Sequence, residues 1–398
     1  MNALRCETFE SFESAAEYRA QWDRFVLDVH GSIYMSFDWC RIWWEYYGQQ
    51  RRLQIYVLWE GHELVGIVPM FIDRLRFAVV QLRIAKLMGS DFCQKLADPA
   101  IRDSWVEPVM ERILNDLLEN GKCDAVWFAP LSELCRTVTT VREVCSKNSS
   151  TLTVARSSMM SPHTVFVLPV RFDEYMESLD PHVRKDARYG VRRFAREYNL
   201  SVETCEDGDQ LEHEFNLFKQ MHDRQWNSQG KRGHFGSWPR ATDFNVAMIR
   251  SFSKLGRVRL FRISANDHVV AYQYGYVFGD CYYWILPARE VGEEWDRLSL
   301  GVIAVVKMIE MLIPEGVRRI EAGLGHYEYK LRYGGKEYAA HALLVTRNRS
   351  AVWCRTRLYV LASRILDVVY HNIIYRRLAL NCSFLRRPLW GMWVRSQM

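Results

Sequence analysis

The sequence lacks closely spaced cysteine pairs, the usual mark of zinc sites and of disulfide frameworks. Its ten cysteines are scattered over 398 residues, with no Cys-x-x-Cys pair and no Cys/His cluster at zinc spacing. We therefore expect no metal ion and no disulfide framework. Reduced thiols are typical of a cytoplasmic protein.

Long apolar runs are also missing. No run of about 18 uncharged apolar residues occurs, so the sequence predicts no membrane span. Residues 1–7 contain no apolar core of a signal peptide. We expect no export and a cytoplasmic location.

Composition and length indicate a folded protein with two domains. Hydrophobic residues make up 49% of the chain, with 22 Gly and 11 Pro, which disfavours long disorder and fibrous repeats. A chain of 398 residues exceeds one ordinary core. The net charge is +6, from 53 Lys and Arg against 47 Asp and Glu, which weakly favours anionic ligands.

Two segments share the plan of an apolar strand, a short polar turn and a second apolar strand. The first joins residues 53–59 to 64–71, and the second joins 258–264 to 269–277. Alternating apolar positions around a polar turn predict β-hairpins. Their recurrence about 200 residues apart indicates a duplicated domain, although two hairpins can also be similar by chance.

Similar elements flank both hairpins, so we expect two α/β (α+β) halves with mixed β-sheets flanked by helices. The patterned segments are interrupted at residues 157–162, which suggests the boundary between the halves. The predicted domains are residues 1–160 and 161–346, followed by a helical tail at 347–398. The flanking elements expected are helices at 39–47, 106–118, 215–226 and 300–313, and strands at 125–128 and 318–322.

The tail is rich in arginine and poor in acidic residues. From Ala339 onward the only acidic residue is Asp367. A basic helix with aromatic and aliphatic residues on its other face is typical of proteins that lie on an anionic membrane surface. The alternative is a helix that packs on the folded domains with its arginines in solvent. The arginines concerned are Arg347, Arg349, Arg355, Arg357, Arg364, Arg376, Arg377, Arg386, Arg387 and Arg395.

The strongest local pattern is at residues 318–330, where a short strand opens into a turn with two glycines. Such glycines let the backbone turn tightly and approach a ligand. Glu321 at the strand end is expected to converge with Tyr329 and Lys330 beyond the turn. We predict the active cleft here.

This pattern resembles the Acetyltransf_6 or CelD-like family of the GNAT superfamily, whose members typically carry an acidic residue, two glycines and Tyr-Lys at this place. Glu321 stands where the family more often has Asp. The resemblance implies tandem GNAT-like domains and acyl transfer. Further segments similar to the family, in the family's order, are residues 37–39, 47–48, 184–193, 221–226, 270–272 and 299–301.

The resemblance also implies how an acyl-CoA donor would bind. In GNAT-like folds two splayed strands offer backbone groups to the pantetheine arm, and a helix N-terminus faces the pyrophosphate, to which it presents free N–H groups and a positive dipole end. The superfamily's glycine-spaced pyrophosphate loop is not evident in this sequence. The corresponding positions, at the start of the predicted helix, are Arg297, Ser299, Leu300 and Gly301.

Acyl transfer to an amine needs an acceptor for the proton of the amine but no dedicated nucleophile. Glu321 is the candidate base, provided that burial raises its pKa toward neutrality. A surface ion pair with Arg318 or Arg319 is the alternative. Tyr329 and Lys330 are expected to orient the substrate or steady the leaving group, or else to close the turn by packing.

Arginines that recur every four residues share one face of a predicted helix and are candidates for binding an anionic substrate. A phosphate-rich donor, a nucleotide-linked sugar or a tRNA would neutralise them, as would acidic neighbours and solvent. The row consists of Arg184, Arg188, Arg192 and Arg196, flanked by Lys185 and Arg193. The other substrate-binding candidates are His222 and Trp226, whose spacing of one helical turn is more typical of a core or cleft wall, and Gln273.

Three functions are consistent with these patterns. The leading hypothesis is an N-acyltransferase that moves an acetyl or other short acyl group from acyl-CoA to an amine of a sugar or related cell-envelope or exopolysaccharide precursor. The duplicated halves are also similar to Fem-type aminoacyltransferases, which use aminoacyl-tRNA on peptidoglycan precursors. The third hypothesis is a non-catalytic, membrane-associated assembly protein that keeps an acyltransferase fold.

Overall fold

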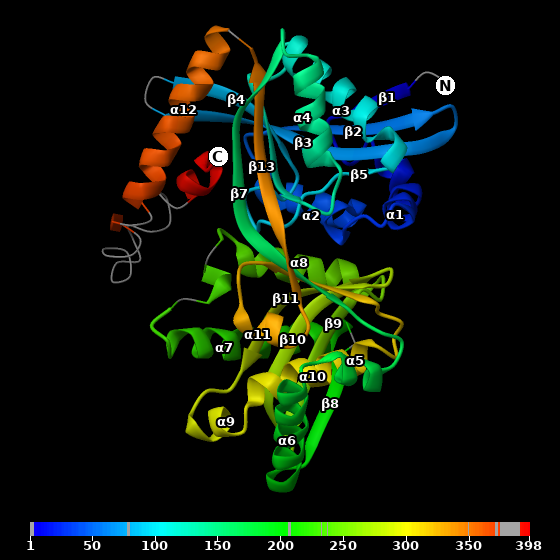
Figure 1. Cartoon of the computed structure of the whole chain (residues 1–398), viewed down its shortest axis with the longest axis vertical. Coiled ribbons are helices and arrows are strands. Elements are labelled where there is room, and N and C mark those ends of the chain that lie inside the picture. The colour runs from blue at the N-terminus through cyan, green and yellow to red at the C-terminus, as the bar shows by residue number, and fades with distance from the viewer. Residues whose placement is uncertain are drawn as a thin grey trace. The chain divides into compact units, whose positions relative to one another are not determined.

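The computed structural model describes residues 4–77, 80–205, 208–231, 233–236, 238–348, 350–370, 373–374 and 391–398. The chain divides into two compact units, Met1–Ser161 with Ala339–Met398, and Pro162–Tyr338. Each unit is built on β-strands flanked by helices (Figure 1). The predicted α/β class with mixed sheets is therefore confirmed.

The first unit has a mixed sheet in the order β1-β2-β3-β4-β6-β13, continued by the first part of β7. Neighbours are antiparallel from β1 to β4, β4 and β6 are parallel, and β6 and β13 are antiparallel. The short β5 pairs with β3. The strands are β1 (Leu4–Phe9), β2 (Arg52–Glu60), β3 (Glu63–Phe77), β4 (Val80–Leu87), β5 (Ala100–Ile101), β6 (Ala125–Ser132), β7 (Leu152–Val167) and β13 (Lys336–Arg347).

The helices of the first unit include the elements expected from the sequence at 39–47 and 106–118. The second of these is split, because an α-helix passes into a π-helical turn at Asn115–Glu119. The α-helices are α1 (Arg19–Asp28), α2 (Phe37–Tyr47), α3 (Val106–Leu114), α4 (Thr137–Lys147) and α12 (Ala351–Asp367), and the short 3-10 helices are Ala16–Tyr18, Ile33–Met35 and Asp103–Trp105.

The C-terminal segment belongs to the first unit. Tyr359 and Val360 of α12 lie in a buried cluster with Trp127 of β6 and Leu82 of β4. The segment at 391–398 returns to α12, where the hydroxyl of Ser363 donates to the carbonyl of Ser396 at 2.7 Å. Of the arginines singled out in the tail, Arg349, Arg376, Arg377, Arg386 and Arg387 lie outside the described residues.

The second unit has a mixed sheet in the order β8-β9-β10-β11-β12, continued by the last part of β7. Neighbours from β8 to β11 are antiparallel, β11 and β12 are parallel, and β12 and β7 are antiparallel. The strands are β8 (Leu200–Cys205), β9 (Val258–Ala265), β10 (His268–Phe278), β11 (Cys281–Arg289) and β12 (Arg319–Leu324). The helices are α5 (Phe172–Ser178), α6 (Pro181–Glu197), α7 (Gly208–Asn227), the 3-10 turn His234–Gly236, α8 (Ala241–Ser253), α9 (Glu293–Arg297), α10 (Leu300–Leu312) and α11 (Glu328–Arg332).

Both predicted hairpins form. β2 pairs with β3 around Gly61, which adopts a left-handed φ of 58°, and β9 pairs with β10 around Asn266 and Asp267. Both residues of the second turn have positive φ, which Asn and Asp tolerate better than most side chains. The turn residues therefore set the register of each hairpin, as expected.

Helices cover the two faces of the second sheet with different side chains. Tyr272 and Tyr274 of β10 pack their rings against Phe218 of α7. On the other face, Tyr282 of β11 and Ile320 of β12 share a buried cluster with α10. Because side chains alternate along a strand, these contacts assign each strand position to one face. Within the described residues, no helix is long and apolar enough to cross a membrane.

Candidate active site in the second unit

The two parallel strands of the second unit separate at their carboxyl ends. Within β11 and β12, which are described throughout, pairing begins at Cys281 with Arg319 and ends at Tyr283 with Glu321. β11 runs on to Arg289 without a partner on this edge. In open sheets, ligands bind in the crevice at the carboxyl ends of parallel strands, so this separation is a natural seat for a ligand.

A helix begins at the same end of the sheet. α10 follows β11 in the chain and precedes the parallel β12, so its N-terminus lies at the carboxyl edge of the two strands. Ser299, the residue before α10, has a left-handed φ of 57°, and no side chain caps the first turn. The backbone N–H groups there, with the positive end of the helix dipole, suit an anion.

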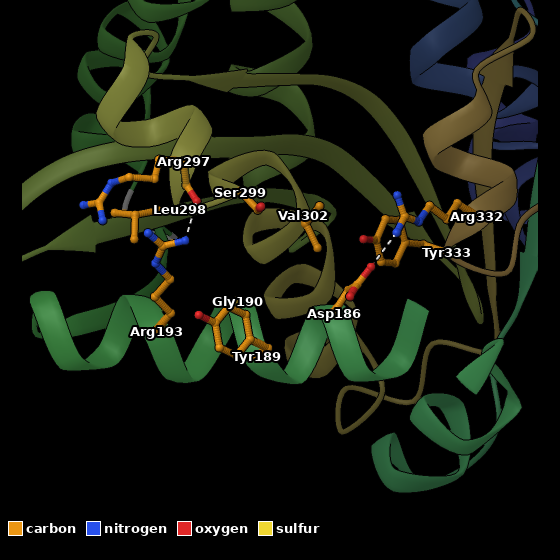
Figure 2. A pocket seen from close by; sticks show the side chains of 10 residues that line it. All are labelled: Asp186, Tyr189, Gly190, Arg193, Arg297, Leu298, Ser299, Val302, Arg332 and Tyr333. Carbon is orange, nitrogen blue, oxygen red and sulfur yellow. Dashed lines mark hydrogen bonds and ion pairs between the residues drawn. The ribbon is translucent and has the colours of Figure 1, made fainter. Parts of the chain in front are cut away.

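A hollow of about 220 Å³ lies at this helix start. Figure 2 shows that α6 forms one of its walls and that the turn between α9 and α10 and the end of α11 complete it. The lining residues are Asp186, Tyr189, Gly190, Arg193, Arg297, Leu298, Ser299, Val302, Arg332 and Tyr333.

Guanidinium groups outnumber carboxylates around the hollow. Arg332 binds Asp186 at 2.7 Å, and Arg297 binds Glu197 at 2.6 Å. Arg193 donates to the carbonyl of Arg297 at 3.2 Å and lies 3.7 Å from Glu197. Three cations thus face two anions. The excess positive charge favours a phosphate group over a neutral ligand.

A buried histidine and carboxylate meet where β12 leaves β11. The Nδ1 atom of His163, in β7, lies 3.0 Å from Oε2 and 3.2 Å from Oε1 of Glu321. The other hydrogen bond to the carboxylate comes from the backbone N–H of Gly323, at 3.1 Å. His163 and Glu321 are 1% and 9% exposed. A carboxylate in this position fixes the orientation of the imidazole, and the pair can accept and pass on a proton.

Known proteins resemble this part of the chain. Residues 181–331 match the sequence model of the acetyltransferase (GNAT) domain family. The match includes the strand separation, α10 and Glu321, and it agrees with the resemblance noted in the sequence.

Similarity to solved structures extends over both units. The crystal structure of FemX has a TM-score of 0.60 and 9% sequence identity, covering 85% of this chain and 96% of that one. At this identity the likeness shows the fold alone. No curated protein sequence matches the chain.

Two further structures are similar at lower scores. One is L-PGS from Bacillus licheniformis, with a TM-score of 0.49, 11% identity, and coverage of 85% of this chain and 95% of that one. The other is a tandem GNAT protein from the clavulanic acid biosynthesis pathway, with a TM-score of 0.43, 10% identity, and coverage of 88% and 100%.

The residues predicted to bind the cofactor lie at the end of α9 and the start of α10. Arg297 and Ser299 line the hollow. Leu300 is buried and packs into the core beneath the first turn of α10. A Cβ added to Gly301 would lie 3.5 Å from the side chain of Arg289, an ordinary contact distance.

Lys330 contacts β12 from α11, and Tyr329 contacts β11. The buried Lys330 ammonium donates to the carbonyl of Ala322 at 2.6 Å and lies 4.3 Å from the centre of the Tyr327 ring. Tyr329 is 39% exposed, and its ring meets Trp284 edge-on at 6.2 Å. Lys330 therefore ties α11 to β12 at the residue after Glu321, the candidate base.

The row of arginines on α6 does not line the hollow. Arg188 and Arg192 are exposed, and Arg192 donates to the carbonyl of Arg188 at 3.2 Å. Arg184 is bonded to the carbonyl of Glu177 at 3.4 Å, and Lys185 is exposed. The α6 side chains in the hollow come from the neighbouring face, so the row presents a separate basic surface.

His222 and Trp226 lie on α7. His222 is fully buried, donates from Nδ1 to the carbonyl of Pro287 at 2.9 Å, and accepts at Nε2 from the backbone of His234 at 3.3 Å. Burial lowers the pKa of His222. Trp226 packs edge-on against His234 at 4.8 Å. These contacts fasten the His234 turn to β11.

Gln273 of β10 is the remaining predicted residue. Strand alternation places it on the face opposite Tyr272 and Tyr274, the face of α10. Trp284 of β11 lies on that face too. Gln273 Oε1 and Trp284 Nε1 are both buried without a hydrogen-bond partner in the part of the chain described. A buried polar atom without a hydrogen-bond partner lowers the free energy of unfolding by about 1–3 kcal/mol. Gln273 Oε1 and Trp284 Nε1 are therefore candidates to contact a polar substrate.

The sequence did not single out His163, Arg332 or Trp284. His163 follows the interrupted segment at 157–162 and carries no local motif. Its pairing with Glu321 is a contact between residues 158 positions apart. Among the described residues, no group of three or more His, Cys, Asp or Glu side chains could hold a metal ion.

Proposed function

We propose that the protein is an N-acyltransferase that moves an acetyl or other short acyl group from acyl-CoA to an amine. The observation that carries this proposal is the separation of β11 from β12 after Tyr283 and Glu321, beside the uncapped start of α10 and the hollow rich in arginine. The gap between the two strands would accommodate the extended pantetheine arm, and the start of α10 beside it would bind phosphate.

The donor would lie along the separated strands. Backbone groups of β11 beyond Tyr283 would bind the pantetheine arm, and the first N–H groups of α10 would bind the diphosphate. Arg193 and Arg297 would add charge to that seat. The hollow of about 220 Å³ is smaller than a drug-sized pocket, so it would hold only the phosphate end of CoA.

Glu321 would accept the proton of the attacking amine, with His163 as its partner. The neutral amine attacks the thioester carbon, the carbonyl π bond opens to an oxyanion, and collapse of this intermediate expels the CoA thiolate. The proton taken from the amine then passes to the thiolate. Holding amine and thioester together supplies much of the rate enhancement in such a reaction.

The proposed acceptor is an amine on a sugar or related cell-envelope or exopolysaccharide precursor. A hydroxylated acceptor would supply partners for the unsatisfied Gln273 Oε1 and Trp284 Nε1 atoms. Both an acceptor and a donor are available there, which suits hydroxyl groups, since a hydroxyl both donates and accepts.

Aminoacyl-tRNA is the second candidate donor. The observation in its favour is the exposed arginine row of α6, Arg188 and Arg192 with Arg184 and Arg196, which lies outside the hollow. A polyanion contacting this row would bind with a steep salt dependence, whereas CoA would lose much less affinity with salt.

The test measures CoA thiol release from acetyl-CoA with a panel of amino sugars and nucleotide-linked amino sugars. We expect release that depends on an acceptor and is lost in Glu321→Gln. Glu328→Gln serves as the matched control, because Glu328 is exposed in the adjacent helix. Equal rates in both variants would move the base elsewhere. Transfer from aminoacyl-tRNA with none from acetyl-CoA would establish the second donor.

A further inference from the structure

The C-terminal helix α12 is apolar on two opposite faces. Its inner face, which includes Val352, Tyr359 and Val360, is buried against the first unit. Its outer face carries Leu358, Leu361, Ile365 and Val368, which are 56%, 56%, 55% and 55% exposed. Residues spaced by three and four positions form one continuous stripe along a helix. We call these four residues the outer stripe.

Large aliphatic side chains are rarely exposed in a continuous row. Single exposed hydrophobic residues are normal, but a contiguous patch usually marks a surface that binds something apolar. Ile373, beyond the last turn of α12, is also 47% exposed. We therefore expect the outer stripe to bind an apolar partner.

Arginines border the outer stripe. Arg355, Arg357 and Arg364 are exposed on α12. Arg364 lies close to Arg156 of β7, whose Nε and Nη1 atoms are buried without a hydrogen-bond partner in the described structure. Burial and the charge of Arg364 together lower the pKa of Arg156. Two neighbouring guanidinium groups of this kind attract an anion.

Two carboxylates near these arginines already have partners: Asp124 lies 3.7 Å from Arg355, and Asp367 interacts with Arg156 as well as with Trp393. Asp367, the only acidic residue from Ala339 onward, accepts a hydrogen bond from Trp393 Nε1 at 3.1 Å, on the side where residues 391–398 pack. Ten arginines occupy the same stretch of sequence. The charge beside the outer stripe is therefore complementary to an anionic surface.

The helix is held in place before any partner arrives. Arg395 binds the buried Asp73 of β3 at 2.6 Å, and the neighbouring Ser396 bonds to Ser363 of α12. Figure 1 shows this C-terminal piece, in red, next to α12. Because this surface is already folded, it loses less conformational entropy on binding than a disordered segment would.

We propose that the outer stripe of α12 and its bordering arginines dock the protein on an anionic membrane surface. The aliphatic side chains enter the boundary between headgroups and acyl chains, and the arginines bind lipid phosphates. The helix lies along the membrane plane and does not cross the bilayer. This inference is independent of the proposed acyl transfer.

The test is flotation of the full-length protein with vesicles of phosphatidylglycerol and phosphatidylcholine, compared with phosphatidylcholine alone. We expect binding to the anionic vesicles that weakens with salt. Leu361→Glu should reduce the bound fraction at least about fivefold, because it places a charge in the apolar contact. The matched control is Leu134→Glu in the same unit, where Leu134 is 58% exposed in the turn after β6.

Point variants are preferable to a truncation, which would remove Tyr359 from the core of the first unit. Arg364→Gln should weaken anionic binding, while Arg142→Gln, an exposed arginine of α4, should not. If Leu361→Glu fails to fold, Leu361→Ser replaces it. Wild-type binding in both α12 variants would overturn the proposal. So would light scattering that shows the outer stripe joining two copies of the chain, with no vesicle binding.

Discussion

The Nδ1 atom of His163 lies 3.0 Å from the Glu321 carboxylate, and both side chains are buried at the point where β12 separates from β11. The carboxylate is also bonded to the backbone N–H of Gly323. The orientation of His163 therefore depends on Glu321, and the orientation of Glu321 depends on the glycine turn.

Replacing His163 by Gln tests this pairing. We expect kcat to fall about 10²-fold or more, because proton transfer by a positioned group contributes roughly that factor. The KM for acetyl-CoA should change little. His213→Gln, an exposed histidine of α7, is the control and should behave as wild type. A kcat unchanged in His163→Gln would limit His163 to a packing role.

Lys330 is predicted to support the turn that carries the site. Lys330→Met removes the ammonium that binds the Ala322 carbonyl, while it keeps most of the aliphatic chain. Loss of this buried bond should lower the free energy of unfolding by about 1–3 kcal/mol. Urea denaturation followed by tryptophan fluorescence measures this change. Lys336→Met, at an exposed position, should leave stability unaltered.

The basic residues of the hollow and the exposed arginine row of α6 can be distinguished by mutation. Arg297→Ala removes a cation from the hollow and should raise the Kd for CoA about tenfold, consistent with a charge-assisted hydrogen bond. Arg192→Ala changes the exposed row and should leave the CoA affinity intact. If Arg192→Ala weakens CoA binding and Arg297→Ala does not, the phosphate seat has been assigned to the wrong face.

The first unit should lose stability in acid through Asp73. Burial alone would raise the pKa of Asp73, but the hydrogen bond from Arg395 and the charges of Arg51 and Lys86 lower it. A carboxyl group whose pKa is lowered by folding stabilises the folded state. This stabilisation is fully present above the ordinary carboxyl pKa of about 3.9, and it is lost as the pH falls through the pKa of the folded state.

Removing Arg395 should therefore cost stability mainly near neutral pH. Arg395→Met is expected to lower the melting temperature at pH 7, and the difference from wild type should shrink below about pH 4. Scanning calorimetry at pH 7 and pH 3 measures both values, with Arg142→Met as the control at an exposed site. A difference that stays constant with pH would show that Arg395 stabilises by packing alone.

His222 gives a second pH dependence, of different origin. Burial lowers its pKa, so the unfolded chain binds a proton more readily, and stability should fall as the pH drops below about 6.5. His222→Asn keeps a donor and an acceptor but does not titrate. This variant should flatten the slope of stability between pH 7 and pH 5 and leave turnover close to wild type. A large loss of turnover without a change in slope would instead favour substrate binding.

Local patterns in the sequence were sufficient to predict the hairpins, the helix at α10 and the glycine turn. Each depends on residues close together in the chain: alternating apolar positions, turn residues with positive φ, and glycines after a short strand. The positions of Glu321 in a short strand and of Ser299 before a helix could be predicted because both residues lie inside such patterns.

The rest of the site depends on contacts between distant segments. His163 meets Glu321 only because β7 pairs with β12, and Arg332 reaches the hollow from α11. Periodicity showed that Arg184, Arg188 and Arg192 share a helix face. It could not show that Gly190 and Arg193, on the next face, are turned toward α10. Tertiary packing decides which face is used.

The most direct test is titration calorimetry of the purified protein with acetyl-CoA and CoA. Gly301→Glu places a carboxylate at the start of α10, and Gly236→Glu, where an added Cβ meets nothing within 4 Å, is the control with the same charge change. The account predicts micromolar binding by wild type and Gly236→Glu, and loss of that binding in Gly301→Glu. Failure of the wild-type protein to bind either compound, or equal binding by both variants, would contradict it.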